Sequence, residues 1–346
     1  MKSSNYTDSP PERYKKIETI DAHTGGEPLR VIVDGLPPLD GSTVLAKRRY
    51  FERELDEYRR ALMWEPRGHA DMYGAVLTEP NDENADFGVV FMHNEGYSTM
   101  CGHGIIALAK IIHESECLGI GSLDDEITID TPAGRVVAEV EQNHHGIVES
   151  VEFTNVPSFV YARSQKVSVP SWGTIEVDIA FGGAFYAYFD AEQINLELTP
   201  GNFETLVDVG RSVKTAVANS VESKHPYEDD LGFLYGTIIT SDPHTDSADS
   251  RNVCVFADGE VDRCPTGTGV SGRVALQAER DALSPNELFT VESIVGSKFT
   301  GSYEKALEFG GYQAVQPKVS GSAYIMGRHE FLIDPADPFG EGFFLR

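Results

Sequence analysis

The chain has 346 residues, of which 40% are hydrophobic, and a net charge of −27 from 55 acidic and 28 basic residues. Such a charge disfavours binding to nucleic acid or anionic lipid, because both need a basic surface. No run approaches the ~18 apolar residues of a membrane-spanning helix, and the length suffices for two domains of ordinary size.

The N-terminal segment from Met1 to Lys16 is polar, contains two adjacent prolines and lacks the apolar core of a secretory signal. We therefore expect a short disordered tail there. The cysteines are too few for a disulfide scaffold and form no Cys-x-x-Cys pair, so a reducing cytoplasm is the expected location. They are Cys101, Cys117, Cys254 and Cys264.

Strand patterns dominate the chain, and a few helical patterns interrupt them. Apolar and β-branched residues predict strands, several of them alternating, and Asp-Gly or Gly-Gly turns separate many of these runs. The helix predicted at 102–115 is apolar nearly all round, so we expect it to be buried and wrapped by sheet. In chain order, the prediction is helix 48–63, strand 88–92, helix 102–115, strands 126–130, 136–140, 151–154, 174–178 and 185–189, helix 200–217, strands 237–240 and 252–256, and helix 267–281.

Two pairs of similar signals indicate a diverged internal repeat. An Asp followed after three residues by Gly-Gly occurs at 21–26 and again at 178–183. Each is followed by a motif that opens a helix, Cys101-Gly102-His103-Gly104 in the first half and Thr266-Gly267-Thr268-Gly269 in the second. The same order at similar separation predicts two structurally equivalent domains.

Cys101 is the strongest candidate for chemistry. A thiol at a helix start lies beside free backbone N–H groups and the positive end of the helix dipole, which favour a thiolate and can also hold an anion. The flanking glycines let a ligand approach the backbone, and His103 adds a donor. The alternatives are a buried structural cysteine and a capping role for His103.

The second motif places Thr266 where symmetry would place another cysteine. Its hydroxyl is not a base near neutral pH, although it can donate a hydrogen bond, and it is also a suitable N-cap. Asp262 is either a partner for a cationic amine or one half of a solvated pair with Arg263. Cys264, two residues before Thr266, is a candidate second base.

Other motifs are absent from the sequence or too weak to use. His69-Ala70-Asp71, His93-Asn94-Glu95 and His144-His145 lack the spacing of a zinc site, so we predict no metal. The glycine pairs do not form a dinucleotide fingerprint, and there is no Gly-x-Ser-x-Gly elbow.

These residues resemble the proline racemase superfamily over most of the chain. The matching segments are 21–28 (DAHTGGEP), 65–74 (EPRGHADMYG), 94–104 (NEGYSTMCGHG), 181–183 (FGG) and 262–269 (DRCPTGTG). Racemases and epimerases of the family carry a cysteine in both helix-opening motifs. The exchange to Thr266 resembles the trans-3-hydroxy-L-proline dehydratase branch, although Cys264 stands where the family usually has serine.

The resemblance implies an α+β fold of two pseudo-symmetric domains, each a curved, mainly antiparallel sheet around a central helix, with the site between them. The first domain would comprise 1–165 and 322–346, and the second 166–321. It implies no cofactor, a small amino-acid substrate and, since related enzymes are often dimers, a homodimer.

It also implies residue roles. Cys101 would remove the Cα proton. A separate hypothesis, from the chemistry of the reaction, is that Thr266 positions or protonates the leaving hydroxyl, directly or through a water. Substrate would be held by Gly102, His103, Asp262, Gly267 and Thr268, with Tyr73 and Phe256 against its ring. The alternatives are a proline or 4-hydroxyproline racemase or epimerase that uses Cys264 as second base, and a non-catalytic amino-acid binding protein.

Overall fold

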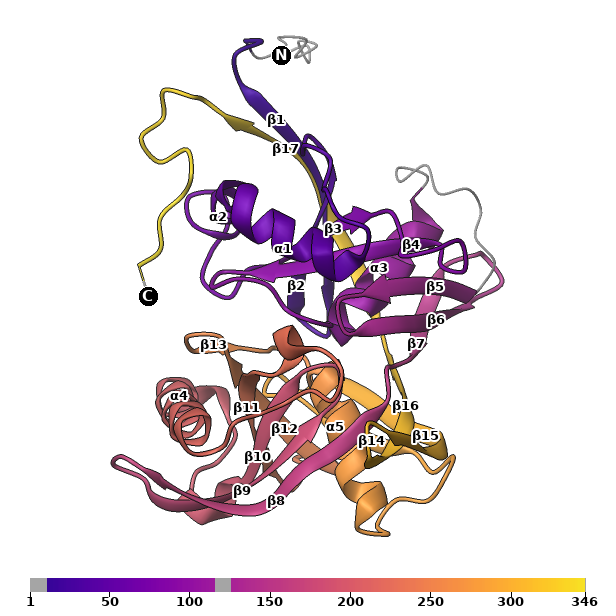
Figure 1. The fold of residues 1–346 in the computed structure, drawn as a ribbon, viewed down its shortest axis with the longest axis vertical. Coiled ribbons are helices and arrows are strands. Elements are labelled where there is room, and N and C mark those ends of the chain that lie inside the picture. The colour runs from indigo at the N-terminus through magenta and orange to yellow at the C-terminus, as the bar shows by residue number, and fades with distance from the viewer. Residues whose placement is uncertain (1–10, 116–125, 346) are drawn as a thin grey trace.

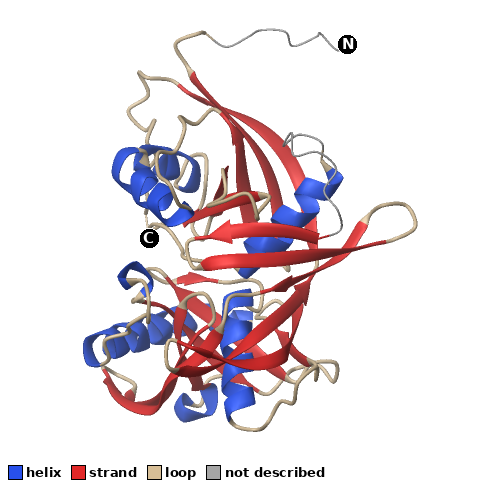
Figure 2. Ribbon diagram, turned by 45° about the vertical axis from the view of Figure 1, so that its right-hand side comes forward, coloured by secondary structure: helices blue, strands red, loops and turns tan. Residues whose placement is uncertain are grey.

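A computed structural model describes residues 11–115 and 126–345. Two sheet-rich bodies lie one above the other, and each contains a central helix, α3 in the upper body and α5 in the lower body (Figure 1). Strands form most of both bodies (Figure 2).

Cys117 and the start of the predicted N-terminal tail lie outside the described residues. The expected tail was wrong at its end, because Lys15 and Lys16 begin the first strand.

The first half of the chain alternates hairpins with helical crossovers. β1 and β2 form an antiparallel hairpin, β2 and β3 are parallel across α1 and α2, and β4 and β5 are parallel across α3. The elements are β1 (Lys15–Thr24), β2 (Glu27–Asp34), α1 (Val44–Glu54), α2 (Asp56–Met63), β3 (Tyr73–Thr78), β4 (Phe87–His93), α3 (Gly102–Glu114), β5 (Glu126–Thr131), β6 (Gly134–Gln142) and β7 (Val148–Thr154).

The second half repeats this order of pairings. β9 and β10 form the hairpin, β10 and β11 are parallel across α4, and β12 and β14 are parallel across α5. The elements are β8 (Ser158–Val169), β9 (Gly173–Phe181), β10 (Phe185–Asp190), α4 (Phe203–Ser220), β11 (Leu234–Ser241), β12 (Ser250–Phe256), β13 (Glu260–Val261), α5 (Gly267–Glu279), β14 (Phe289–Glu292), β15 (Lys298–Phe309), β16 (Tyr312–Gly321) and β17 (Ala323–Ile333), with short 3-10 helices at Ala191–Ile194, Pro200–Asn202 and Asp229–Leu231.

Two long strands connect the halves. β16 pairs antiparallel with β7 and β8, and β17 then returns to pair with β1 along its length. In the second half β8 occupies the equivalent place beside β9. The predicted α+β architecture with its internal repeat is confirmed by this topology. The domain boundaries stay a prediction, and β8 runs across the one expected between residues 165 and 166.

The apolar helix predicted after Cys101 is buried, as expected. Every residue of α3 from Gly102 to Ile112 is buried, and the helix packs against strands that include β1, β6, β7 and β17. Even Lys110 is buried, and its ammonium group donates to Glu114 and to the Val148 carbonyl. This burial fixes the start of the helix, where Cys101 lies.

The single helix expected at 48–63 is instead two helices. Thr43 caps α1 by accepting the Ala46 N–H, which moves the start of the helix upstream. Leu55 ends α1 with φ of −130° and ψ of 13°, and α2 begins at once with two acidic residues in its first turn. Acidic side chains stabilise a helix N-terminus, so these two residues favour the start of a new helix. The chain therefore breaks at Leu55 although the helical pattern of the sequence continues across it.

The described helices include none that is both long and apolar enough to cross a membrane. The cytoplasmic location and the homodimer stay predictions.

Candidate active site

The starts of the two central helices touch each other. A Cβ atom added to Gly102 would lie 2.7 Å from the Cα of Gly267, and one added to Gly267 would lie 2.8 Å from the Cα of Gly102. Only glycine permits this approach. Two helix N-termini, each with free N–H groups and a partial positive charge, therefore meet at one point between the two bodies.

The two Gly-Gly hairpin turns pack around this meeting point. Thr24, at the first turn, donates its hydroxyl to the His103 carbonyl at 2.8 Å. Thr99, just before Cys101, donates to the Gly183 carbonyl of the second turn at 2.5 Å. A Cβ on Gly183 would lie 3.0 Å from Met100 Cβ, which shows how tightly the second turn is held. The repeated motifs thus meet in space.

A small, nearly closed cavity of about 10 Å³ lies at the helix starts. All the predicted site residues except Gly267 line it, and Gly267 lies behind Gly102. Met100, Tyr186 and Tyr235 also line the cavity and were not predicted. The complete lining is Tyr73, Met100, Cys101, Gly102, His103, Tyr186, Tyr235, Phe256, Asp262, Thr266 and Thr268.

Cys101 is the N-cap of α3 and is buried. Its Sγ accepts the Gly104 N–H at 3.2 Å and lies 3.2 Å from His103 Nδ1. Burial raises the pKa of the Cys101 thiol well above its ordinary value, the Gly104 N–H lowers that pKa by less, and Asp262 raises it further. The helix start lowers the pKa of the thiol through the Gly104 N–H, as expected, but burial outweighs this effect, so the expected net preference for a thiolate was wrong in the free protein.

His103 is a neutral imidazole. Burial lowers its pKa to about 3, so it does not supply a positive charge to Cys101 near neutral pH. The edge of its ring contacts Tyr73 at a centroid separation of 4.7 Å. His103 is therefore an uncharged group that can donate or accept a hydrogen bond in the cavity.

Thr266 does not use its side chain as an N-cap. The hydroxyl instead donates to Oδ2 of Asp262. The backbone of Thr266 has φ of +68°, a conformation that is uncommon for a β-branched residue and costs of order 1–3 kcal/mol. Such strain persists where surrounding structure enforces it, and here it directs the hydroxyl towards Asp262.

Asp262 is buried, which excludes the solvated pair with Arg263. Burial raises the pKa of Asp262 to about 7, although the Thr266 hydrogen bond and the Arg263 charge oppose the shift. Arg263 instead binds Asp71 at 2.6 Å, and its backbone N–H donates to Oε2 of Glu27 at 2.7 Å. Burial also raises the pKa of Glu27 well above its ordinary value.

Glu260 adds another buried carboxyl group beside this loop. It lies 3.7 Å from Nδ1 of His93, and burial raises its pKa. Asp71 and His93 come from the two short polar clusters considered for metal binding, and both contact the loop of the second half instead. The surroundings of Asp262 are therefore rich in carboxyl groups, which attract a cation.

Aromatic rings form one wall of the cavity. Phe256 stacks on Tyr235 at 5.4 Å with an interplanar angle of 13°, and the Tyr73 and Tyr235 hydroxyl groups lie 3.3 Å apart. Tyr186 forms a hydrogen bond of 2.7 Å with the Thr268 hydroxyl, and Tyr188 donates to the Gly269 carbonyl. The alternation of Tyr186 and Tyr188 on one strand face was a usable signal, because both point at α5.

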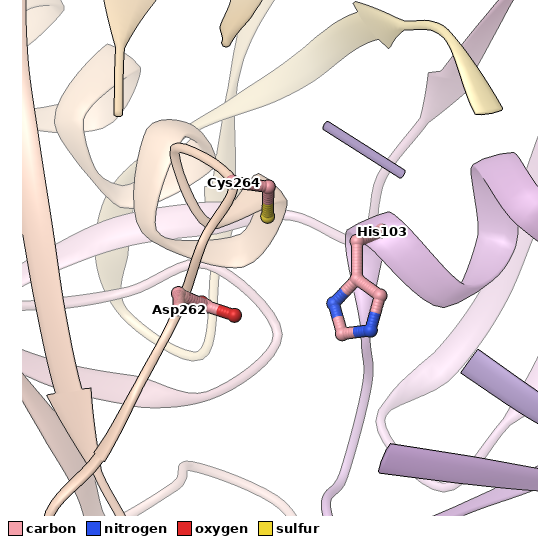
Figure 3. A group of neighbouring side chains, drawn as sticks. All are labelled: His103, Asp262 and Cys264. Carbon is pink, nitrogen blue, oxygen red and sulfur yellow. The ribbon is translucent and has the colours of Figure 1, made fainter. Parts of the chain in front are cut away.

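Cys264 lies close to the cavity without lining it. Its Sγ accepts the Thr266 N–H at 3.3 Å. One ligand-type atom from each of His103, Asp262 and Cys264 can be chosen so that all three lie within 4.8 Å of one another (Figure 3). No sequence spacing indicated this group, since His103 is in the first half and the other two are in the second.

Comparison with known proteins gives consistent results over nearly the whole chain. A family model described as proline racemase matches residues 19–344. A Colwellia psychrerythraea protein named trans-3-hydroxy-L-proline dehydratase is 46% identical over 335 residues, which cover 97% of this chain and 94% of that protein. A Burkholderia multivorans protein named 3-hydroxyproline 2-epimerase is 44% identical over 334 residues, covering 96% of this chain and 99% of that one.

A solved structure has the same overall fold. The hydroxyproline epimerase from Agrobacterium vitis, crystallised with bound trans-4-hydroxy-L-proline, superposes with a TM-score of 0.89 at 29% identity. The superposition covers 96% of each chain.

Proposed function

Because the chain belongs to the proline racemase family, we propose that it dehydrates trans-3-hydroxy-L-proline to Δ1-pyrroline-2-carboxylate and water. Cys101 is the base that removes the Cα proton in this proposal. Among the relatives, a protein 46% identical and another 45% identical carry the name of this activity.

The observation that carries the proposal is the asymmetry of the two helix starts. A thiol begins α3, whereas a threonine hydroxyl committed to Asp262 begins α5. Racemisation needs a base on one face of Cα and an acid on the other. A single thiol at the cavity can remove the Cα proton, but no second thiol returns a proton to the opposite face. When C3 carries a hydroxyl, elimination of water is then the expected outcome.

Substrate binding would convert Cys101 into a base. In the free site, burial and the nearby carboxyl groups of Asp262 and Glu27 raise the pKa of the Cys101 thiol. A substrate ammonium group placed on Asp262 adds a positive charge beside Cys101 and favours the thiolate. The substrate carboxylate would occupy the meeting point of the two helix N-termini, where free N–H groups of Gly102, His103, Gly267 and Thr268 lie.

The reaction then follows from this placement. The Cys101 thiolate takes the Cα proton, and the electron pair of the broken bond forms a double bond between Cα and C3 as the C3–O bond breaks. The helix N-termini stabilise negative charge that develops on the carboxylate. The departing hydroxide takes a proton from solvent and leaves as water, and Cys101 then returns the Cα proton to solvent, so that no proton is gained or lost overall. The resulting enamine tautomerises to Δ1-pyrroline-2-carboxylate.

Thr266 would position the leaving hydroxyl. The hydrogen bond to Asp262 uses the proton of the Thr266 hydroxyl and fixes its direction. The Thr266 oxygen can therefore accept a hydrogen bond from the C3 hydroxyl, either directly or through a bridging water. Tyr73 and Phe256 would pack against the pyrrolidine ring.

The deciding experiment incubates purified protein with trans-3-hydroxy-L-proline and follows the pyrroline with o-aminobenzaldehyde. We expect product with the natural chain, none with Cys101→Ser and product with Cys254→Ser, a buried cysteine of the second half. Substrate binding without product from the natural chain would favour the amino-acid binding protein and contradict the proposal.

A second candidate is an epimerase that uses Cys264 as the opposing base. The approach of Cys264 to His103 and Asp262 favours it, as does the relative named 3-hydroxyproline 2-epimerase. In D2O, an epimerase would incorporate deuterium at Cα with inversion, and Cys264→Ser would abolish that inversion. Pyrroline formation that survives Cys264→Ser favours the dehydratase.

A further inference from the structure

The group formed by His103, Asp262 and Cys264 contains three different kinds of metal ligand. An imidazole from α3 faces a carboxylate and a thiol from the loop before α5, and all three side chains are buried. Figure 3 shows the Cys264 sulfur and the Asp262 carboxylate on one side of the gap and the His103 ring on the other. Nitrogen, oxygen and sulfur ligands together are a set that suits Zn²⁺.

The separations fit a single ion after a small movement. Zinc bonds of about 2.3 Å to sulfur and 2.0–2.2 Å to nitrogen and oxygen place any two ligands within about 4.4 Å of each other. The chosen atoms of the three side chains already lie within 4.8 Å of one another. A shift of a few tenths of an ångström in the three side chains would therefore bring them into range. Cys101 Sγ lies 3.2 Å from His103 Nδ1 but is not a member of the group.

The charge of the surroundings favours a cation. Three buried carboxyl groups lie on or beside the loop of Asp262, those of Glu27, Asp71 and Glu260. Arg263 pairs with Asp71 and accounts for one of them. Thr266 occupies Oδ2 of Asp262 and leaves Oδ1 available. A divalent ion would relieve the repulsion among the carboxyl groups and replace the proton on Cys264.

We propose that His103, Asp262 and Cys264 form an inhibitory binding site for a thiophilic divalent cation such as Zn²⁺. The ion takes the position on Asp262 that the substrate ammonium group needs, so metal and substrate exclude each other. That competition rests on the proposed function, whereas metal binding itself does not.

Direct binding tests the site without reference to activity. Co²⁺ added to the full-length protein, with a reductant that does not bind metals, should produce sulfur-to-cobalt charge-transfer absorption, and Zn²⁺ should displace it. Cys264→Ser should abolish the absorption, and Asp262→Asn should weaken binding by at least about tenfold. Cys254→Ser, which removes a buried thiol outside the group, should leave both signals in place. Circular dichroism checks that each variant is folded.

Two results would overturn the site. The first is no metal-dependent absorption in the natural chain. The second is an unchanged spectrum in Cys264→Ser, and loss of absorption in Cys101→Ser would then assign the bound metal to Cys101 instead. If binding is found, Zn²⁺ should inhibit pyrroline formation and excess trans-3-hydroxy-L-proline should relieve the inhibition. A chain that binds Co²⁺ through Cys264 but forms no pyrroline would refute the dehydratase and retain the metal site.

Discussion

The hydroxyl of Thr266 donates a hydrogen bond to Asp262 from a backbone conformation that threonine rarely adopts. The equivalent residue of the first half, Cys101, has an extended backbone and accepts a hydrogen bond from its own helix. The two repeats have therefore diverged in conformation as well as in side chain. One helix start presents an acceptor sulfur, and the other presents a hydroxyl bound to a buried carboxylate.

Thr266→Ala should lower kcat/KM for dehydration by about 10–100-fold, because a hydrogen bond to a charged group contributes roughly 1.5–3 kcal/mol. Loss of this bond also raises the pKa of Asp262, since the Thr266 hydroxyl holds it down. The acid limb of the pH profile of kcat/KM should then move to higher pH. Thr266→Ser keeps the hydroxyl, so both kcat/KM and the position of the acid limb of its pH profile should stay as in the natural chain. Full activity in Thr266→Ala would show that the hydroxyl has no part in the reaction.

Thr266→Cys should add inversion at Cα. A thiol at the start of α5 restores the symmetry of the two motifs and provides an acid on the opposite face from Cys101. The measurement is deuterium uptake with loss of optical rotation in D2O, using L-proline, which has no hydroxyl to lose. Combining the change with Cys264→Ser ensures that the added thiol is responsible. Absence of inversion would mean that residue 266 does not face Cα.

Local patterns explain why much of the fold was predictable. The helices that begin at Gly102 and Gly267 and the strands around them follow from periodicity and from glycine at the helix starts, which are properties of neighbouring residues. Leu55 shows the limit, because a helical pattern continues across it while the chain turns to bury the side chain. Tertiary packing overrides propensity there.

Side-chain contacts between the two bodies could not be predicted from the sequence. A solvated pair of Arg263 with its neighbour Asp262 was one alternative, but Arg263 binds Asp71 from the other half. Tyr235 reaches the cavity from two residues before the strand pattern that we detected. Both results depend on how the two sheets dock, and periodicity within one segment carries no information about that.

Gly102→Ala should destabilise the protein by about 2 kcal/mol or more and abolish activity. The added methyl would lie 2.7 Å from the Gly267 backbone and 2.8 Å from the Phe153 ring, so the helix starts must separate. Gly96→Ala is the matched control, because a Cβ there meets nothing within 4 Å. Thermal unfolding of both variants measures the difference. Equal midpoints would contradict the close contact between the two helix starts.

Asp262→Asn should stabilise the protein at pH 8 while it abolishes activity. Burial raises the pKa of Asp262 from an ordinary 3.8 to about 7. Between these values the folded protein holds a proton at Asp262 that the unfolded chain has lost, so the free energy of unfolding falls as pH rises through that window. Above it the folded state carries the full cost of a buried carboxylate. Asparagine keeps an acceptor for Thr266 and avoids this cost.

The gain in unfolding free energy should be about 1–3 kcal/mol at pH 8 and should disappear as pH falls towards 4. Denaturant unfolding at a series of pH values measures it as a difference between variant and natural chain, which cancels the other titrating groups. Asp258→Asn, at an exposed carboxyl that pairs with Arg211, is the control and should show no such dependence. A difference that stays constant with pH would mean that Asp262 does not change its protonation on folding. The carboxylate that we propose binds the substrate amine would then carry no penalty to the stability of the fold.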